Sequence, residues 1–532
     1  MFEKENRRWL ISASIIILFF TSVPYLMGYF KQGTEWHFTG FLFGVEDGNS
    51  YIAKMLSGTY GSWLFKSPYT AIPQKGVLAF LPYIIMGKLA FPPEVHDQLV
   101  ALFQIFRWVA GGLLIFSVYL FAGLFSANEN QKRWASLVIL LGGGLGWIGW
   151  MMLPETGAWR LPLEVYSPEA FGFLSILGLP HLAAARAFLL FGLFFYIKEE
   201  HRSSVVGDSV KGGLCWLTAG FFQPLAIVVG YGILAWHILL VFLINRNNRL
   251  KEFEKYLKKA IILGSISVPW VIYNFLFFQS DDYLRAWYTQ NVIQSPPIWD
   301  YLWSFGLFLG ASIPAVIWII RNKREQQSIL LAWVLSACSL AYFPYNVQRR
   351  FIDGIWIALV LLVFLSYELV QKNVWKNVIK ILVGSTGAAT LLVLMVILKG
   401  VWTLQMPVYR PAGEVQFFNT IIDRIKPGSI VLCSYETANT LPAWDPVFVL
   451  AGHGPESANL STVLPEVKDF FSGQKDIEWQ KNFIKQYSIN FIISGPLEQK
   501  LGVWEQKYAR HYTQVVEVNG YSVYRSEPIN GE

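Results

Sequence analysis

The sequence predicts an α-helical membrane protein that crosses the bilayer many times and ends in a small soluble α/β domain. Of its 532 residues, 54% are hydrophobic and only 15% are charged, which is too little polar surface for a soluble protein of this length. Apolar segments of about 20 residues recur along the chain, and each is long enough to cross a bilayer core of about 30 Å. After residue 398 the apolar runs become short and rich in β-branched residues, which is typical of a folded α/β domain.

We place about eleven membrane spans by length and hydropathy. A signal peptide is the alternative for the first span, but no small-residue cleavage site follows its apolar run. The long apolar segment 212–244 is divided at Gln223-Pro224, because proline interrupts a helix. The predicted spans are residues 9–30, 97–125, 134–153, 181–197, 212–223, 224–244, 260–279, 299–320, 328–343, 352–370 and 378–398.

Lysine and arginine residues set the expected orientation. If the N-terminus is cytoplasmic, every cytoplasmic loop is basic, as the positive-inside rule requires. The chain then forms a multi-pass plasma (inner) membrane domain, residues 1–398, with its first outer loop at residues 31–96, and an extracytoplasmic α/β domain, residues 399–532. The net charge of +7 comes from separate loops and not from one basic face, so we exclude nucleic acid as a partner and expect membrane lipids.

The tail, residues 399–532, has the alternating patterns of a small α/β domain. Its short β-branched and aromatic runs predict strands, and residues 476–488 have the helical spacing of apolar side chains. The predicted strands are residues 429–434, 446–452, 489–494, 513–518 and 521–525.

The first outer loop contains two adjacent carboxylates, Glu46 and Asp47. If the segment from Asp47 is helical, Asp47, Tyr51 and Lys54 lie at positions i, i+4 and i+7 and share one face. Residues 77–91 are too short for a span and contain a proline, which predicts a half-buried amphipathic or re-entrant helix. Solvation alone accounts for many acidic pairs in loops, and interfacial lysines and aromatics are commonly membrane anchors.

Four arginines lie where membrane topology does not favour a charge. Arg349 and Arg350 fall at the outer start of a span, and Arg107 and Arg186 fall inside spans, where a charge costs about 2.5–3.5 kcal/mol. Such groups usually face a polar cavity, and the guanidinium fork suits a phosphate. The carboxylates that offer Arg107 a purely structural pairing instead are Glu94 and Asp97.

An outward carboxylate and phosphate-binding arginines are typical of sugar transfer from a lipid-phosphate donor. The carboxylate takes the proton of an acceptor hydroxyl or amine as it attacks the anomeric carbon, while cations stabilise the leaving phosphate. We therefore predict an inverting glycosyltransferase with a polyprenyl-phosphate-linked sugar donor and a lipid, glycan or protein acceptor. The alternatives are a polytopic transporter or lipid flippase, and a surface-polysaccharide polymerase or ligase.

The joint order of four short motifs resembles the GT-C superfamily of membrane glycosyltransferases, which includes protein O-mannosyltransferases and bacterial aminoarabinose transferases. The motifs are EDGNSYIAKM around Asp47, Pro180-His181, QRRF at residues 348–351 and GHGPE at residues 452–456. The resemblance implies that Asp47 is the general base and that Glu46 is a metal ligand or tunes the pKa of Asp47. The resemblance adds His181 as a contact of the donor phosphate or the acceptor, and a helix cap or a satisfied polar group is the alternative. The other candidate substrate-binding residues are Tyr51, Lys54, Arg107, Arg186, Arg349 and Arg350.

The resemblance leaves the need for a divalent metal open. Some superfamily members hold a metal with an acid in the second outer loop, where this chain has Glu155, Glu164 and Glu169 without a D-x-D pattern. A structural turn is the default interpretation of His453, and contact with the acceptor is the alternative. The sequence has no P-loop and no G-x-G-x-x-G opening a helix after a strand.

Overall fold

The computed structural model describes residues 4–126, 128–152, 161–198, 205–245 and 248–528. The chain divides into two compact units, which are described separately. The first unit comprises Met1–Val23, Phe106–Phe275 and Ile293–Leu398. The second unit comprises Pro24–Ile105, Leu276–Val292 and Lys399–Glu532.

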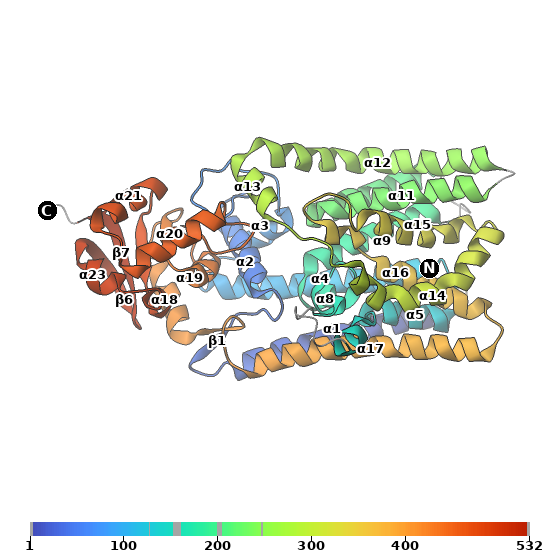
Figure 1. Cartoon of the computed structure of the whole chain (residues 1–532), viewed down its shortest axis with the longest axis horizontal. Helices are drawn as coiled ribbons and strands as arrows, with labels where there is room; N and C mark the ends of the chain where they lie inside the picture. Colours follow the sequence, from blue (N-terminus) through green and yellow to red (C-terminus); the bar gives the residue numbers. More distant parts are fainter. Residues whose placement is uncertain (1–3, 127, 153–160, 199–204, 246–247, 529–532) are drawn as a thin grey trace. The chain divides into compact units, whose positions relative to one another are not determined.

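The first unit is helical (Figure 1). Its apolar segments form helices because, away from water, a helix satisfies every backbone hydrogen-bonding group within one segment. Four long helices contribute residues to both units: α1 (Lys4–Lys31), α4 (Val95–Ala122), α12 (Arg249–Ser280) and α17 (Asn373–Trp402). The others are α5 (Glu129–Leu141), α6 (Gly146–Met152), α7 (Leu163–Tyr166), α8 (Gly172–Gly178), α9 (Pro180–Ile197), α10 (Val205–Phe222), α11 (Pro224–Ile244), α14 (Ile298–Arg321), α15 (Glu325–Leu340), η1 (Gln348–Ile352) and α16 (Ile355–Leu369).

Every predicted span lies mainly on a helix, but the predicted number of spans is not confirmed. Among the described residues, eight helices are long and apolar enough to cross a membrane, and α5 with α6, a pair bent by 49°, would make a ninth. The two predicted spans that fall short are α10, which contains Asp208 and Lys211, and α15, which has only 16 residues. The predicted class, a helical membrane protein with many spans, is thus confirmed, and the number of spans is not.

The predicted break at Gln223-Pro224 is confirmed. Helix α10 ends at Phe222 and α11 begins at Pro224, and Gln223 between them is extended, with φ −152°. Proline disfavours the helical conformation of the residue before it, whereas its own fixed φ suits the first turn of a new helix. The local sequence therefore determined this boundary.

The tail contains a five-stranded sheet with the order β4-β3-β5-β7-β6. Strand β3 (Ile430–Leu432) is parallel to β4 (Phe448–Val449) and β5 (Phe491–Ser494), whereas β7 (Tyr521–Pro528) is antiparallel to β5 and to β6 (Tyr512–Val518). All five predicted strands and the predicted helix at 476–488 are therefore confirmed, the latter as α21 (Ile477–Tyr487). The remaining tail elements are α18 (Ala412–Ile421), α19 (Tyr435–Thr440), η2 (Leu441–Ala443), α20 (Leu460–Ser472), α22 (Pro496–Gln499), α23 (Trp504–Tyr508) and η3 (Ala509–His511).

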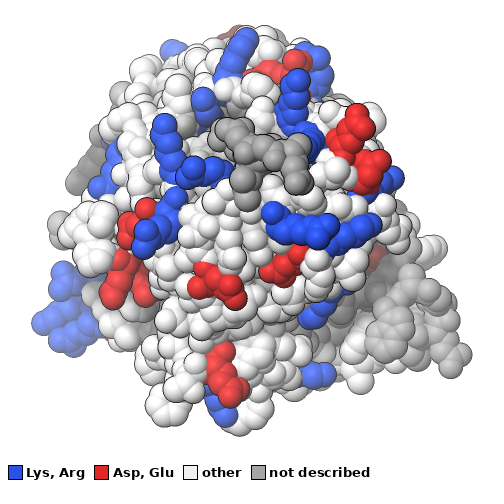
Figure 2. All heavy atoms as spheres, turned by 90° about the vertical axis from the view of Figure 1, so that its left-hand side faces the viewer, with Lys and Arg blue, Asp and Glu red and all other residues white. Residues whose placement is uncertain are grey.

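A hydrophobic core lies between this sheet and its helices. Leu432 and Ile492 of neighbouring strands pack with Phe470 of α20, Phe483 of α21 and Trp504 of α23, and all are nearly or fully buried. On the face at the end of the tail, basic and acidic side chains are interspersed among uncharged ones (Figure 2). Charges of mixed sign are typical of a solvated surface.

The first loop and the tail belong to the same unit. Strand β1 (Trp36–Phe38) pairs antiparallel with β2 (Tyr409–Pro411), and α2 (Val45–Thr59) packs against α19 and η2 of the tail (Figure 1). Residues 24–105 therefore group with the tail, whereas the sequence grouped them with the rest of 1–398. The unit also contains α13 (Asp282–Gln290).

The helix predicted at 77–91 is wrong in length. Only α3 (Leu81–Gly87) is helical, and Phe80 before it is left-handed, with φ 51°. Proline fits the first turn of a helix but not its interior, so Pro82 allows the helix to begin only just before it. Tyr83 and Ile84 of α3 are buried.

Candidate active site

The first turn of α2 contains the acidic pair predicted from the sequence. Gly44 precedes the helix in the left-handed conformation, with φ 58°, and its carbonyl accepts the N–H of Gly48 at 2.9 Å. Glycine adopts this conformation without the steric cost that a Cβ would bring, and a Cβ here would also lie 3.3 Å from Asp47 Oδ2. Carboxylates in the first turn interact favourably with the helix dipole, so α2 holds Glu46 and Asp47 at a stable position.

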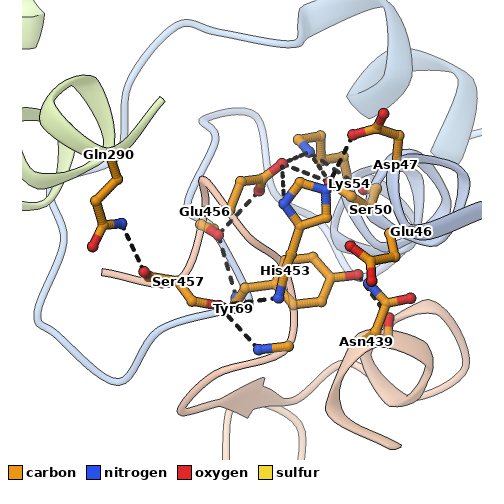
Figure 3. Close-up of polar contacts among 12 residues, drawn as sticks. Glu46, Asp47, Ser50, Lys54, Tyr69, Gln290, Asn439, His453, Glu456 and Ser457 are labelled. Carbon is orange, nitrogen blue, oxygen red and sulfur yellow. Dashed lines mark hydrogen bonds and ion pairs between the residues drawn. The ribbon is translucent and has the colours of Figure 1, made fainter. Parts of the chain in front are cut away.

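Asp47 contacts a histidine of the tail. Asp47 Oδ1 lies 3.2 Å from His453 Nε2 (Figure 3). The His453 side chain is only 6% exposed, whereas the Asp47 side chain is 54% exposed. The buried imidazole thus contacts a carboxylate that remains accessible to solvent and to a substrate.

A buried ion pair lies beside this contact. Lys54 Nζ is 2.6 Å from Glu456 Oε1, and both side chains are at most 5% exposed. Glu456 also accepts hydrogen bonds from Ser50 at 2.6 Å and from Ser67 at 3.1 Å. Burial alone would raise the pKa of Glu456, but the charge and the hydrogen bond of Lys54 hold that pKa below its usual value. Glu456 is therefore an ionised carboxylate at neutral pH.

The Lys54 ammonium is consequently occupied by partners inside the fold. Its ammonium contacts Glu456 and the Ser50 hydroxyl, and it is 1% exposed. The face shared by Asp47, Tyr51 and Lys54 on α2 exists as predicted, but this geometry does not support the predicted substrate contact of Lys54. Tyr51 stacks on Tyr83, with ring centroids 4.8 Å apart, and its substrate-binding role stays a prediction.

The loop that presents His453 is held by hydrogen bonds within the second unit. The Ser457 hydroxyl accepts the N–H groups of Gly452 and His453 at 2.9 and 3.0 Å. Gln290 of α13 donates to the Ser457 carbonyl at 2.8 Å (Figure 3). A Cβ on Gly452 would lie 2.4 Å from the carbonyl carbon of Ala438, so only glycine lets the loop pack this closely on α19.

Two tyrosines complete the surroundings of the acidic pair. The Tyr69 hydroxyl donates to the Asn439 carbonyl at 3.0 Å, and its ring lies 5.4 Å from the His453 ring. The Tyr435 hydroxyl donates to Glu46 Oε2 at 3.4 Å. Burial and the neighbouring carboxylates raise the pKa values of Tyr69 and Tyr435 above their usual value. Both phenols are therefore neutral donors at neutral pH.

Arg186, in the first unit, forms a structural ion pair. Its Nε donates to Asp353 Oδ1 at 2.8 Å, and both side chains are at most 4% exposed. Its other nitrogens donate to the carbonyls of Phe171, Pro168 and Glu169 and to the Ser175 hydroxyl. A guanidinium with five N–H donors is largely satisfied by these partners, so this geometry does not support the predicted contact with substrate.

Arg107 is likewise buried within the first unit. It is 1% exposed, and it donates to the hydroxyls of Thr21 and Ser22 at 3.3 and 2.7 Å. Two of the groups that Arg107 contacts are therefore hydroxyls of α1, and its substrate contact stays a prediction. The structure places His181 in the first turn of α9, half-buried, and its substrate contact stays a prediction.

Arg349 and Arg350 present the guanidinium groups that are most accessible among the four predicted arginines. Their Nε atoms lie 3.6 and 3.9 Å from the buried Glu169 carboxylate, beyond ordinary hydrogen-bond length, and their side chains are 20% and 31% exposed. The Arg349 guanidinium lies over the Tyr166 ring, 5.1 Å from its centroid. Tyr166 also lines a cavity of about 580 Å³, whose other lining residues are Gln294, Ser295, Pro296, Pro297, Asp300 and Tyr342.

The acids considered as metal ligands do not form a metal site in the described part of the chain. Glu164 is buried and accepts the N–H of Gly146 at 2.8 Å, and burial raises its pKa. Glu169 lies between the two arginines, and Glu155 lies outside the described residues. Across the described segments, no three His, Cys, Asp or Glu side chains are grouped as metal ligands.

Sequence reasoning missed the partners of Asp47 and Lys54. The GHGPE motif was noted, but His453 was interpreted by default as part of a turn, and Glu456 was given no role. The two contacts join residues more than 400 positions apart. A single sequence carries no signal for such pairs, and the one clue was that an acidic and a histidine-containing motif both belong to parts predicted to lie outside the membrane.

Comparison with known proteins identifies solved structures with a similar fold. No family model and no curated protein matches the sequence. Among solved structures, the archaeal oligosaccharyltransferase AglB from Archaeoglobus fulgidus, in complex with an inhibitory peptide and a dolichol-phosphate, is similar with a TM-score of 0.56 and 10% identity, over 96% of this chain and 73% of that one. ArnT from Cupriavidus metallidurans, bound to undecaprenyl phosphate, is similar with a TM-score of 0.52 and 12% identity, over 97% of both chains.

The apo form of the Archaeoglobus fulgidus oligosaccharyltransferase is also similar, with a TM-score of 0.52 and 11% identity, over 98% of this chain and 75% of that one. The chain therefore has the fold of the GT-C membrane glycosyltransferases, and the predicted fold class is confirmed. Because identity is this low, the likeness establishes the fold, and activity has to be argued from the residues.

Proposed function

We propose that this protein is an inverting glycosyltransferase that moves a sugar from a polyprenyl-phosphate-linked donor to an acceptor at the outer face of the membrane, with Asp47 as general base. One observation carries the proposal: in a chain with the GT-C fold, Asp47 lies in the first turn of α2, is 54% exposed and contacts the buried His453 at 3.2 Å. The similar structures hold dolichol-phosphate and undecaprenyl phosphate, which supports a lipid-linked donor. The same fold favours a transferase over a transporter.

The proposed reaction needs one proton acceptor. As the acceptor oxygen or nitrogen forms its bond to the anomeric carbon, its proton passes to the Asp47 carboxylate. The bond from the anomeric carbon to the phosphate oxygen breaks, and the phosphate leaves with the electron pair. A positioned general base contributes about 10²–10⁴-fold to the rate of such a step. Attack opposite the leaving group inverts the anomeric centre.

Arg349 and Arg350 are proposed separately as ligands of the donor phosphate. Their distances from Glu169 exceed hydrogen-bond length, and Arg349 Nε has no hydrogen-bond partner among the described residues. A guanidinium fork that is not saturated internally can bind phosphate oxygens in a bidentate manner. The nearby cavity of about 580 Å³ is within the usual range for small-molecule sites, about 300–1,000 Å³.

The test is turnover of a panel of labelled polyprenyl-phosphate sugars by membranes that carry the wild type, Asp47→Asn or the control Asp469→Asn in equal amounts. Asp469 is a matched control, because it is a tail aspartate with 53% of its side chain exposed. We expect turnover of one donor by the wild type and the control, with inversion, and a loss of about 100-fold or more in Asp47→Asn. A chelator arm measures metal dependence.

A folded Asp47→Asn protein with full turnover would disprove the assignment of the base. Retention of anomeric configuration in the product would disprove single displacement. If the wild type turns over no donor and binds no polyprenyl phosphate, the lipid-phosphate donor itself is wrong, and a diphosphate-linked donor or transport becomes the better hypothesis.

A further inference from the structure

We propose that His453, which the tail supplies, is a positioning residue for Asp47: its Nε2–H donates to Asp47 Oδ1 and so fixes the orientation of the carboxylate that takes the acceptor proton. This inference rests on the function proposed above. It makes the tail a part of the catalytic apparatus, and it gives a role to a histidine that lies 406 positions from the aspartate along the chain.

The hydrogen-bond chemistry determines which ring nitrogen donates. An ionised carboxylate only accepts hydrogen bonds, so the nitrogen 3.2 Å from Asp47 Oδ1 has to carry the proton. The other ring nitrogen, Nδ1, lies 3.9 Å from Glu456 Oε1, which is beyond hydrogen-bond length. The tautomer with Nε2–H is therefore the one that this contact selects.

The imidazole is held firmly enough to orient another group. Its side chain is 6% exposed, its own backbone N–H donates to the Ser457 hydroxyl, and its ring packs 5.4 Å from the Tyr69 ring. Glu456, three residues further along the loop, is tied to α2 through the buried ion pair with Lys54. The loop that carries His453 is thus anchored to the same helix that carries Asp47.

The Asp47 side chain is exposed, and a hydrogen bond to a buried group restricts its motion. A side chain with 54% of its surface in water samples several rotamers unless a contact selects one, and ordering it costs free energy. Productive catalysis requires the reacting group to be held within about 0.5 Å of its working position. A displacement of about 1 Å can cost about 100-fold in rate. A hydrogen bond from a buried donor to one carboxylate oxygen helps to meet this requirement.

The test measures kcat and KM of His453→Ala and His453→Gln against the control His511→Gln, with the donor that the wild type turns over. Thermal unfolding of each variant is measured in parallel. His511 is a suitable control because it is a half-buried tail histidine of η3. We expect His453→Ala to lower kcat by about 100-fold with the donor KM unchanged. Gln keeps an N–H donor, so His453→Gln should recover most of this loss. The double variant Asp47→Asn/His453→Ala should be no slower than Asp47→Asn alone, because His453 acts through Asp47.

Full kcat in His453→Ala would overturn the proposal, and so would multiplicative losses in the double variant. Equal losses in the Ala and Gln variants, together with lower thermal midpoints, would mean a merely structural role and would also overturn it. If His453→Ala does not fold, His453→Gln and the double variant Asp47→Asn/His453→Gln carry the test. These outcomes differ from failure of the proposed function, in which the wild type itself turns over no donor. In that case non-additive thermal midpoints of Asp47→Asn and His453→Gln would still support the Asp47–His453 contact, and additive midpoints would reject it.

Discussion

A charged group inside a fold can be enclosed by its partners or left exposed on one side, and the described part of this chain contains examples of both. Arg186 of the first unit pairs with Asp353 at 2.8 Å, and both side chains are at most 4% exposed. Asp47 of the second unit is 54% exposed although its partner, His453, is buried. Burial of the side chain, rather than its charge or its position in a span, thus distinguishes charged groups that stabilise the structure from charged groups that can contact a substrate.

Energetics explain the difference. Taking two charges out of water is costly, and their attraction repays this cost only when further hydrogen bonds satisfy the remaining donors and acceptors. The Arg186 cluster supplies those bonds through carbonyls and a hydroxyl, so the cluster is complete without a ligand. A half-exposed carboxylate keeps much of its hydration and can exchange water for a substrate at lower cost.

We expect the largest effect on stability from substitution of Arg186. Arg186→Met leaves Asp353 buried without its cation, which typically costs about 3–5 kcal/mol. The free energy of unfolding in detergent should fall by that amount, and the folded fraction should retain the donor KM. Arg321→Met is the control, because Arg321 is an exposed arginine at the end of α14. Unchanged stability with a raised donor KM would instead restore the substrate role predicted from the sequence.

The second test concerns Glu456, which links the open cluster to a closed ion pair. Glu456→Gln leaves the buried Lys54 without its carboxylate, and we expect a loss of about 3 kcal/mol in the free energy of unfolding. Glu478→Gln is the control, because Glu478 is an exposed glutamate in the first turn of α21. Equal stability of the two variants would show that the ion pair contributes nothing.

The same residue predicts a pH dependence. The pKa of folded Glu456 lies below its usual value of 4.5, so its stabilisation is complete above that value and is lost as the pH falls through the folded pKa. Wild-type stability should therefore fall more steeply below about pH 4.5 than that of Glu456→Gln. Denaturation curves at a series of acidic pH values measure this, and parallel curves for the two proteins would contradict it.

We expect the smallest effect from substitution of Arg349 and Arg350, in contrast with the enclosed Arg186 of the same unit. Arg349→Lys and Arg350→Lys keep the charge but lose the planar fork. We expect the donor KM to rise about tenfold, equivalent to about 1.4 kcal/mol, while the free energy of unfolding changes by less than about 0.5 kcal/mol. Arg321→Lys is the control for both measurements. A loss of stability without a change in KM would place these arginines with Arg186, as structural groups.

Local signals explain which predictions were right. The apolar segments, the break at Pro224, the five tail strands and the helical segment from Asp47 each depend on residues within a few positions of one another. The helix at 77–91 was predicted too long because hydropathy outweighed Pro82. The sequence did not indicate the carboxylate partners of Lys54 and Arg186, which lie 402 and 167 positions away.

The sequence by itself determined the class of this protein: a chain of apolar helices with an α/β tail and an acidic pair just after the first helix. Hydropathy and periodicity depend on neighbouring residues, so they can be evaluated from the sequence without knowledge of the packing. Only the tertiary structure decided that Asp47 meets His453, that Lys54 meets Glu456 and that Arg186 is enclosed by Asp353 and backbone carbonyls. Hydrogen bonds act over about 3 Å, and whether two groups hundreds of residues apart come that close depends on the packing of every element between them.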